Sequence, residues 1–320
     1  TFLFSFWYFL GYISDPMITG SEKGINISKD IETDHKISTP WSQEIEKKWL
    51  PVTKYIGGAE HSVLHLLYAR FISMVLHDLK LTHFEEPFSS FFAHGLIIKD
   101  GAKMSKSKGN VVIPDEYIKK YGADTLRTYL MFLGPFSDGG DFRDSGIEGM
   151  NRFIKRVWRI FTENLGEVEM SPEGYSVMHK TIKKVTEDIS LFKYNTAIAS
   201  LMEWYNFLSN HKTVSKIEAE AFLKLLAPFA PFMTEELYQN LVFRVQGSEL
   251  KSLHLESWPE FDEKYLVSDD VTIVVQVNGK KRGELKLSKS EAENKELVES
   301  QAREIISSYL EQGEKKVIVV

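Results

Sequence analysis

The chain of 320 residues contains no cysteine. Disulfide bonds and thiolate zinc sites are therefore excluded, and this fits the reducing cytoplasm, where we expect the protein to act. Long apolar runs are absent as well. The most apolar stretch, residues 2–13, is too short to span about 30 Å of hydrocarbon as a helix and has no basic flank. We expect it to form core structure, with no membrane as a partner.

An excess of positive charge is also lacking, because the formal net charge is -6. A sum over the whole chain does not exclude nucleic-acid binding, since positive residues can gather on one face. With 43% hydrophobic and 26% charged residues the composition is ordinary for a globular protein, and the length allows two or three domains. Candidate sites must therefore be found from local patterns.

The most informative pattern present is Lys-Met-Ser-Lys-Ser at residues 103–107, between Gly101 and Gly109. Ammonium groups and short hydroxyls donate to phosphate oxygens, and the glycines let the backbone bend around a polyphosphate. An exposed basic turn is the alternative for any lysine-rich segment. The flanks favour a phosphate loop, because residues 95–98 predict a strand before it and Pro114 opens a predicted helix behind it. Strand, loop and helix in this order are typical of an α/β nucleotide site.

Several segments resemble the bacterial-type leucyl-tRNA synthetases, a family of class I aminoacyl-tRNA synthetases. The first is the Lys-Met-Ser-Lys-Ser loop, which is the signature loop of class I. The others lie at residues 55–61, 65–71, 121–127, 144–149 and 226–232, so that the likeness covers nearly the whole chain. The opening residues depart from the family pattern, because Phe4 and Phe6 stand where the family has an acid and a serine. These two changes leave the shape of a leucine pocket open.

The resemblance implies an α/β fold in three parts. Residues 1–149 would form the second half of the Rossmann-like catalytic domain, residues 150–262 a helical anticodon-binding-type domain, and residues 268–320 a small α+β tRNA-binding domain. The family's His-x-Gly-His motif, which lies in the first half, and its editing domain have no counterpart in the sequence. We therefore expect a C-terminal fragment or a separate subunit that needs an N-terminal half as its partner.

The activity implied by the resemblance is that of a leucine–tRNA ligase. Leucine would attack the α-phosphate of ATP to give leucyl-adenylate and pyrophosphate, and tRNA(Leu) would then accept the leucyl group. Mg2+ is expected to accompany the ATP. The isolated chain is expected to be inactive. A non-catalytic tRNA-binding module, or a relic of a synthetase, is the alternative.

The resemblance also assigns roles to individual residues. The catalytic set, in which the lysines would hold the phosphates, is Lys103, Ser105, Lys106 and Ser107. Lys106 is shared with the ATP-binding set, whose other members are Gly57, Gly58, Glu60, His65, His94, Gly95, Ile97 and Met104. The leucine-binding residues are Phe2, Ser5, Tyr8 and His61. His61 and His65 stand four apart, but no third ligand is evident nearby, so we expect no metal site.

Beyond residue 150 the apolar period is helical. Phe153, Val157 and Ile160 form one stripe of a predicted helix. The other face carries four cations, Arg152, Lys155, Arg156 and Arg159. The pattern alone allows a solvated surface, whereas the resemblance implies contact with tRNA phosphates. Near the end of the helical region, Thr234 followed by two glutamates predicts the start of another helix.

After Pro259 the apolar period changes from about 3.6 to about 2. Residues 271–277 alternate as a strand, the Asn-Gly pair that follows predicts a hairpin turn, and a second strand is expected at residues 283–287. A charged helix over residues 290–310 and a strand over residues 316–320 would complete a ββαβ module. The predicted tip of the hairpin carries Lys280, Lys281 and Arg282. An exposed turn and an RNA contact are equally consistent with these cations.

Overall fold

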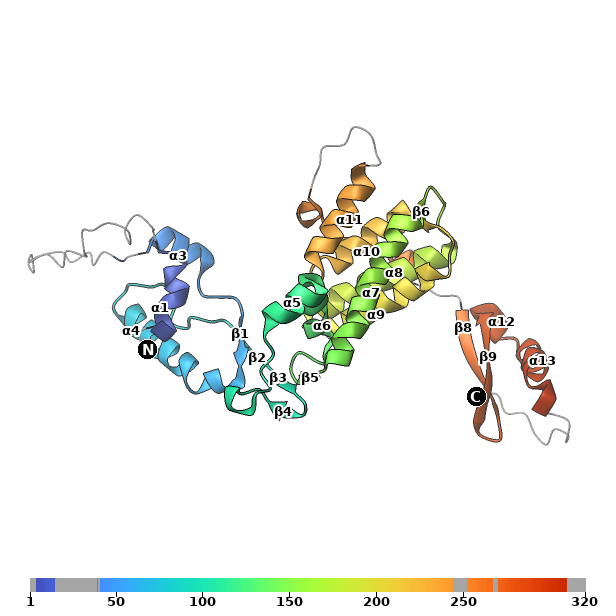
Figure 1. Ribbon diagram of the computed structural model, residues 1–320, viewed down its shortest axis with the longest axis horizontal. Coiled ribbons are helices and arrows are strands. Elements are labelled where there is room, and N and C mark those ends of the chain that lie inside the picture. Colours follow the sequence, from blue (N-terminus) through green and yellow to red (C-terminus); the bar gives the residue numbers. More distant parts are fainter. Residues whose placement is uncertain (1–3, 15–38, 40, 244–251, 267–269, 310–320) are drawn as a thin grey trace, which may run out of the picture. The chain divides into compact units, whose positions relative to one another are not determined.

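The chain divides into two compact units. Figure 1 labels their helices and strands. The computed structural model describes residues 4–14, 39, 41–243, 252–266 and 270–309. The first unit consists of residues 1–122, 129–149 and 193–195, and the second of residues 123–128, 150–192 and 196–320. Helices α6 (Ala123–Phe132) and α7 (Asp144–Glu163) contribute residues to both units. The three domain boundaries expected from the sequence stay predictions.

The first unit alternates helices and short strands. Its other helices are α1 (Phe4–Gly11), α3 (Gln43–Trp49), α4 (His65–Asp78) and α5 (Pro114–Tyr121), with the short 3-10 helices η1 (Ala59–Ser62) and η2 (Lys106–Lys108). Its strands are β1 (Tyr55–Gly58), β2 (Phe91–His94), β3 (Leu96–Lys99), β4 (Ala102–Lys103) and β5 (Gly139–Phe142). The expected order of strand, loop and helix is confirmed by β3, the loop that follows it, and α5.

The strands of the first unit pair mainly in parallel. β1 pairs with β2 so that Gly58 lies opposite His94, and β3 pairs with β5 so that Leu96 lies opposite Gly139. β4 pairs antiparallel with β3 across the turn that starts the phosphate loop. Parallel strands end at the same edge of a sheet, so the residues that follow β1 and β2 are brought together.

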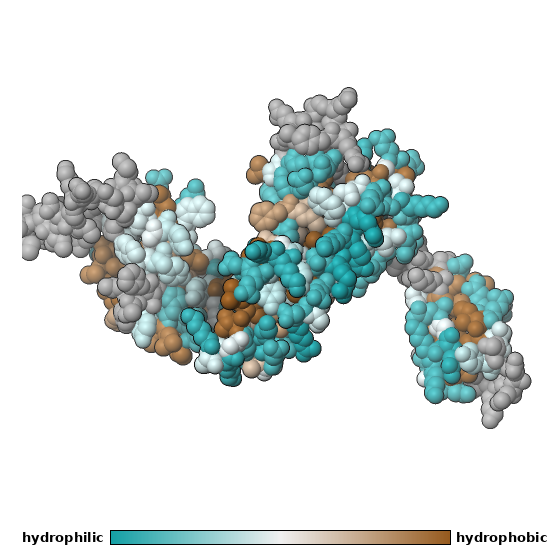
Figure 2. All heavy atoms as spheres, viewed as in Figure 1, coloured by the Kyte–Doolittle hydropathy of each residue, from teal (hydrophilic) through white to brown (hydrophobic). Residues whose placement is uncertain are grey.

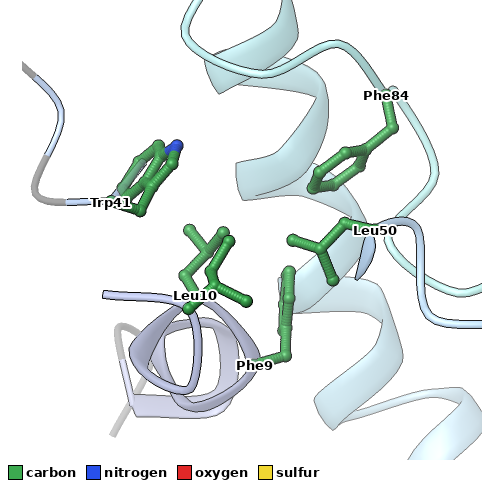
Figure 3. Close-up of a cluster of buried hydrophobic side chains, with 6 residues drawn as sticks. Phe9, Leu10, Trp41, Leu50 and Phe84 are labelled. Atoms are coloured by element: carbon green, nitrogen blue, oxygen red, sulfur yellow. The ribbon is translucent and has the colours of Figure 1, made fainter. Parts of the chain in front are cut away.

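A hydrophobic cluster holds α1 within the first unit (Figure 3). Phe9 and Leu10 of this helix are 3% and 0% exposed, and they share the cluster with Trp41, Leu50 and Phe84. The rings of Phe9 and Phe84 have their centres 6.5 Å apart. Burial of each such side chain contributes roughly 1.5–3 kcal/mol. Phe9, Leu10 and Ile13 of the apolar opening run are thus core residues, as predicted, whereas Trp7, Tyr8 and Tyr12 are exposed.

Long helices make up most of the second unit. After α7 come α8 (Pro172–Ser190), α9 (Tyr194–Ser209), α10 (Lys216–Leu226) and α11 (Pro231–Phe243). The two-residue strands β6 (Leu165–Gly166) and β7 (Val214–Ser215) pair in parallel, and η3 (Leu253–Leu255) and η4 (Glu263–Tyr265) follow α11. Leu201, Trp204 and Phe222 are fully buried. The helical period predicted for this region is confirmed.

Helix α11 begins earlier than the sequence pattern predicts. Thr234 is not its N-cap, because the Thr234 hydroxyl donates to the carbonyl oxygen of Ala230 (2.8 Å) from within the first turn. The cap is the carboxylate of Asp124 in α6, which accepts hydrogen bonds from the backbone nitrogens of Phe232 (3.3 Å) and Met233 (2.6 Å). A cap supplied from a distant helix leaves no trace in the local sequence, which explains the wrong prediction.

The C-terminal hairpin consists of β8 (Asp270–Val277) and β9 (Lys280–Ser288). Asn278 and Gly279 have φ of 51° and 75°, and they form the predicted turn. The second strand begins at Lys280, earlier than expected, because pairing continues past a bulge next to Val275.

The helix expected after the hairpin is interrupted. It consists of α12 (Lys289–Ala292) and α13 (Lys295–Ile305), followed by η5 (Ser307–Tyr309). Asn294 separates the two helices and caps α13 by accepting a hydrogen bond from the backbone nitrogen of Leu297. Val298 of α13 packs with Val275, Leu285 and Leu287 of the hairpin. The strand predicted at residues 316–320 lies outside the described residues.

None of the described helices combines the length and the apolar character that crossing a membrane requires.

Candidate functional site

The phosphate loop lies between β3 and α5, includes the short strand β4, and turns at two glycines. Gly101 and Gly109 have φ of 71° and 65°, in the left-handed region that favours glycine. Between them Lys103 and Lys106 are exposed, and the hydroxyls of Ser105 and Ser107 lie 3.2 Å apart. The four residues predicted to be catalytic therefore stand on one short turn that faces solvent. Met104, also predicted to bind ATP, is half-buried beside them.

Asn110 connects this loop to the β3–β4 hairpin. Its Oδ1 accepts a hydrogen bond from the backbone nitrogen of Ser105 at 2.9 Å. Its Nδ2 donates to the carbonyl oxygens of Lys99, Ala102 and Lys103 at 3.4, 3.5 and 3.4 Å. The sequence prediction omitted this residue. The available signal was an asparagine directly after the loop glycine, since asparagine side chains often bond to nearby backbone groups.

A second network supports the base of the loop. Lys99 ends β3 and donates from Nζ to the Tyr117 hydroxyl at 3.4 Å, and that hydroxyl donates to Asp144 Oδ1 at 2.6 Å. The hydrogen bond to Tyr117 raises the pKa of Lys99, so its ammonium charge is retained. The ammonium nitrogen also lies 5.8 Å from the ring centre of Phe142. These residues were not predicted, because their partners come from separate parts of the sequence.

The strands next to the loop approach each other closely at two glycines. A Cβ atom on Gly95 would overlap the backbone of Asp138 and Gly139, and a Cβ atom on Gly139 would overlap the carbonyl of Leu96. His94 donates from Nδ1 to the Gly95 carbonyl oxygen at 2.8 Å. Three of the predicted ATP-binding residues, His94, Gly95 and Ile97, therefore lie on one continuous segment that joins β2 to β3.

The glycine-rich turn after β1 lies beside this segment. Gly57 and Gly58 are buried at the end of the strand, where Gly58 pairs in register with His94. Glu60, on η1, is exposed, and its carboxylate lies so close to Gly58 that a Cβ atom there would overlap it. The parallel pair thus brings the predicted residues of the turn next to those of β2.

Aromatic rings surround His65 at the start of α4. Its ring centre lies 5.2 Å from that of Tyr55, 5.6 Å from that of Tyr8 and 6.0 Å from that of His61. Burial lowers the pKa of His65, and the neighbouring His61 lowers it further. Burial raises the pKa of Tyr8 far above its ordinary value. Both groups are therefore neutral at neutral pH, and these two rings can contact an apolar ligand.

Two of the four predicted leucine-binding residues meet in this cluster. The rings of Tyr8 and His61 both lie next to the ring of His65. Phe2 lies outside the described residues, and Ser5 is described only as part of the helix α1. The assignment of these residues to leucine stays a prediction.

A cationic face runs along α7. The exposed residues are Arg152, Lys155, Arg156 and Arg159. On the other side Phe153, Val157 and Ile160 are 1%, 0% and 6% exposed, so the predicted division of this helix is confirmed. Figure 2 shows hydrophilic side chains over this helix. The Arg156 guanidinium lies 5.2 Å from the ring centre of Tyr205, which restrains one of the cations.

The three cations of the hairpin are exposed, but they stand at the start of β9 and not at its tip. Lys281 forms an ion pair with Glu284, and the Arg282 guanidinium lies 4.6 Å from the ring centre of Tyr309. Lys280 is the first residue after the turn. Two of the three residues thus have partners within the hairpin module, and an RNA ligand would have to compete with them.

Comparisons with known proteins agree with this arrangement. The family described as tRNA synthetases class I (I, L, M and V) matches residues 43–140, and the anticodon-binding domain of tRNA ligase matches residues 174–297. The first match contains the parallel strands and the phosphate loop, and the second contains α9, α10, α11 and the hairpin. These features together define a class I tRNA synthetase, and the predicted α/β class is confirmed.

Relatives narrow the class. The chain is 43% identical over its whole length to the leucine–tRNA ligase of Thermosipho melanesiensis, and 40% identical over 90% of its length to that of Dehalococcoides mccartyi. Its fold matches, over 100% of its length with 31% identity and a TM-score of 0.70, a chain in the crystal structure of the ternary complex of Agrobacterium radiobacter K84 agnB2 LeuRS-tRNA-LeuAMS. The chain belongs to the leucyl-tRNA synthetase family. It spans 38% and 34% of the two ligases and 41% of the crystallised chain.

Proposed function

We propose that the chain supplies the phosphate-binding half of the adenylation site and the tRNA-binding helices of a leucine–tRNA ligase. The observation that carries this proposal is the exposed loop of residues 103–107, which displays two lysines and two serines at the end of a β-hairpin. The 43% identity to a leucine–tRNA ligase supports leucine and tRNA(Leu) as substrates. An enzyme with these substrates acts where translation takes place, in the cytoplasm.

The chemistry follows from where negative charge develops. A carboxylate oxygen of leucine attacks the α-phosphorus of ATP, and the bond from that phosphorus to the leaving pyrophosphate breaks. Charge then accumulates on pyrophosphate, where the ammonium groups of Lys103 and Lys106 neutralise it and the hydroxyls of Ser105 and Ser107 donate to its oxygens. No covalent enzyme intermediate is needed, so catalysis consists of positioning and charge neutralisation.

The remaining residues place the substrates. Gly57 and Gly58 let the nucleotide approach the backbone of β1, Glu60 accepts hydrogen bonds from the ribose hydroxyls, and the segment from His94 to Ile97 lies along adenine. The rings of Tyr8 and His61 contact the side chain of leucine. Phosphates of tRNA(Leu) lie along the cationic face of α7, where arginine and lysine position RNA without reading its sequence.

Mg2+ is expected to arrive with ATP. Within the described ranges no three acidic or imidazole side chains gather as a metal site requires. Mg2+ keeps several waters and readily binds phosphate oxygens, so the triphosphate and water would supply most of its ligands. This chain would contribute the positive charge of Lys103 and Lys106, which would bind the same phosphates.

An apolar face of α4 supports a need for further polypeptide. Leu64, Leu67, Phe71 and Met74 recur at helical spacing and are 52%, 56%, 56% and 42% exposed. Apolar faces of this kind mark contact surfaces, and parallel sheets normally have both faces covered. The chain spans 38% of its Thermosipho relative, and we propose that an N-terminal half of the enzyme covers this face and completes the site.

Leucine-dependent exchange of pyrophosphate into ATP tests the proposal. We expect no exchange by the chain alone and clear exchange once the N-terminal part of the Thermosipho melanesiensis ligase is added. Substantial exchange by the isolated chain would contradict the need for a second half. Absence of exchange in the mixture, with tRNA binding by the chain retained, would favour the non-catalytic binding module instead.

A further inference from the structure

We infer that Asn110 is a positioning residue, whose side-chain amide holds the phosphate loop in the conformation that presents Lys106 to a polyphosphate. The inference rests on the proposed phosphate-binding role of the loop and extends it to a residue that touches no phosphate itself.

The amide of Asn110 bridges the two arms of the loop. On one side its Oδ1 accepts a hydrogen bond from the backbone N–H of Ser105, the residue directly before η2, at 2.9 Å. On the other side its Nδ2 faces the carbonyl oxygens of Lys99, Ala102 and Lys103, three long contacts of 3.4 to 3.5 Å that its two hydrogens share. One side chain thereby links the end of β3, the short strand β4 and the helical turn that carries Lys106.

Other hydrogen bonds of the loop do not provide this link. In the part of the chain that the structure describes, those of residues 104–109 join loop residues to one another: Lys108 N–H to the Ser105 carbonyl, Gly109 N–H to the Lys106 carbonyl, and Ser105 Oγ to Ser107 Oγ, each at 3.2 Å. Pairing of β4 with β3 ends at Lys103. Asn110 is thus what fastens the turn to the hairpin.

The bonding pattern requires an amide. Asparagine can accept from one backbone group and donate to others at once, whereas an ionised carboxylate only accepts and would face three carbonyl oxygens. An apolar side chain of the same shape would leave the Ser105 N–H without its partner. Glycines with positive φ stand on each side of the loop, so its backbone loses much conformational entropy when it is ordered. The Asn110 amide restricts this backbone and leaves the exposed lysine side chains accessible.

Inorganic pyrophosphate is the probe for a test on the chain itself. We expect Asn110→Leu, which keeps the shape and removes the polar atoms, to weaken pyrophosphate binding about tenfold in calorimetric titration, as loss of a charge-free hydrogen bond does. Asn240→Leu is the matched control, because the Asn240 amide donates within α11 to Glu236. Equal affinity of Asn110→Leu and the control would overturn the inference.

The pH dependence of Asn110→Asp separates positioning from general damage to the fold. At neutral pH we expect this variant to bind pyrophosphate at least as weakly as Asn110→Leu. As the pH falls toward the ordinary carboxyl pKa of about 4, the protonated acid regains a donor, and its affinity relative to the unaltered chain should recover. Asn110→Leu should show no such recovery. Parallel pH curves for the two variants would contradict the role of the amide.

Amide hydrogen exchange at Ser105 provides a readout that needs no ligand. We expect its exchange rate to rise at least about tenfold in Asn110→Leu and to stay unchanged in Asn240→Leu. Unchanged exchange in Asn110→Leu overturns the inference by itself. Lys106→Ala keeps the two proposals apart: if it leaves pyrophosphate binding intact, the phosphate role of the loop fails, whereas weakening by Lys106→Ala but not by Asn110→Leu refutes the positioning role alone.

Discussion

We propose that Lys106 acts through the charge of its ammonium group more than through the shape of its side chain. Its ammonium group is a compact point charge on a flexible stem, and it stands exposed on a single helical turn. A charge in that position gains most when pyrophosphate leaves, because the negative charge is then largest. On the proposed function, we therefore expect this lysine to contribute to the adenylation step and not to the binding of tRNA.

Replacement of Lys106 by alanine tests that assignment in the combined enzyme. We expect leucine-dependent pyrophosphate exchange to fall about 100-fold or more, since loss of one group that stabilises developing charge has effects of this size. The affinity for tRNA, measured by filter binding, should stay within about twofold. Lys119→Ala, on the exposed side of α5, is the control. The reverse pattern would remove the proposed role of Lys106.

A second residue, His179, couples the stability of the second unit to pH. Its Nδ1 accepts a hydrogen bond from the backbone nitrogen of Asp262 at 3.0 Å, and its ring stacks on Tyr265 with centres 4.6 Å apart. Burial lowers the pKa of His179 below its ordinary value of 6.5, against a smaller opposing effect of Asp262. The unfolded chain therefore takes up the proton first. The contribution of neutral His179 to the free energy of unfolding is complete above about pH 6.5, and it is lost as the pH falls through the lower pKa of the folded state.

The free energy of unfolding should accordingly decrease on acidification, and less so in His179→Phe. Phenylalanine keeps the stacking on Tyr265 but has no nitrogen to protonate. We expect urea unfolding at several pH values below about 7 to give a shallower slope for this variant. His211→Phe, at an exposed histidine, is the control. Identical slopes for His179→Phe and the unaltered chain would contradict the assignment.

At the scale of elements, the start of α11 depends on α6. Asp124 is 8% exposed and caps α11, while the Arg127 guanidinium donates to the carbonyl of Pro228 (3.1 Å) and the Thr128 hydroxyl to that of Phe229 (3.3 Å). Three side chains on one helix thus bond to the backbone of residues 228–233, which form the turn after α10 and the first turn of α11. Each side chain supplies a hydrogen-bond partner to a backbone group that the helix ends would otherwise leave unpaired.

Asp124→Ala should therefore lower the free energy of unfolding of the second unit by about 1–2 kcal/mol, the usual effect of losing an N-cap. Asp115→Ala is the matched control, because Asp115 is an exposed acid in the first turn of α5 and its loss should cost less than about 0.5 kcal/mol. Urea unfolding followed by circular dichroism measures both. Equal effects of the two substitutions would argue against a cap from α6.

The cationic face of α7 predicts a salt dependence. Replacement of Arg152, Lys155, Arg156 and Arg159 by glutamine should weaken tRNA binding and reduce the slope of log affinity against log salt by about 3, since each phosphate contact contributes roughly 0.7–0.9. Lys47→Gln with Lys48→Gln, on α3, provides the control. Binding curves at four salt concentrations give the slope. A slope unaltered by the four substitutions would leave α7 as a solvated surface.

At the scale of the whole molecule, the pattern of neighbouring residues predicted the structural features that neighbouring residues determine, such as the buried side of a helix or a tight turn. The stripe of Phe153, Val157 and Ile160 is buried as its spacing predicts, and the Asn-Gly turn of the hairpin forms where expected. Contacts between distant segments could not be predicted this way. The cap from Asp124 and the contacts of the His65 ring with Tyr8 and Phe88 join residues whose neighbours in sequence give no hint of the partner.

The apolar face of α4 leads to a prediction at the same scale. Leu67→Glu should weaken association with an N-terminal half and lower pyrophosphate exchange in the mixture at least about tenfold, because a charge would be buried in an apolar contact. Leu191→Glu, at a leucine that is 59% exposed after α8, carries the same change outside that face and should have little effect. Titration of the mixture with the added half measures the difference. Equal exchange by both variants would contradict a contact at α4.

At the start of the parallel pair of β3 and β5 the two main chains lie in direct contact. Either Gly95 or Gly139 could gain a methyl group only if the strands separated, and the strand that would move is the one from which the lysine-bearing turn departs. The obstructing atoms belong to the backbone, so no replacement of a neighbouring side chain can make room. Any residue larger than glycine at these two positions would therefore clash with the backbone, whatever its chemistry.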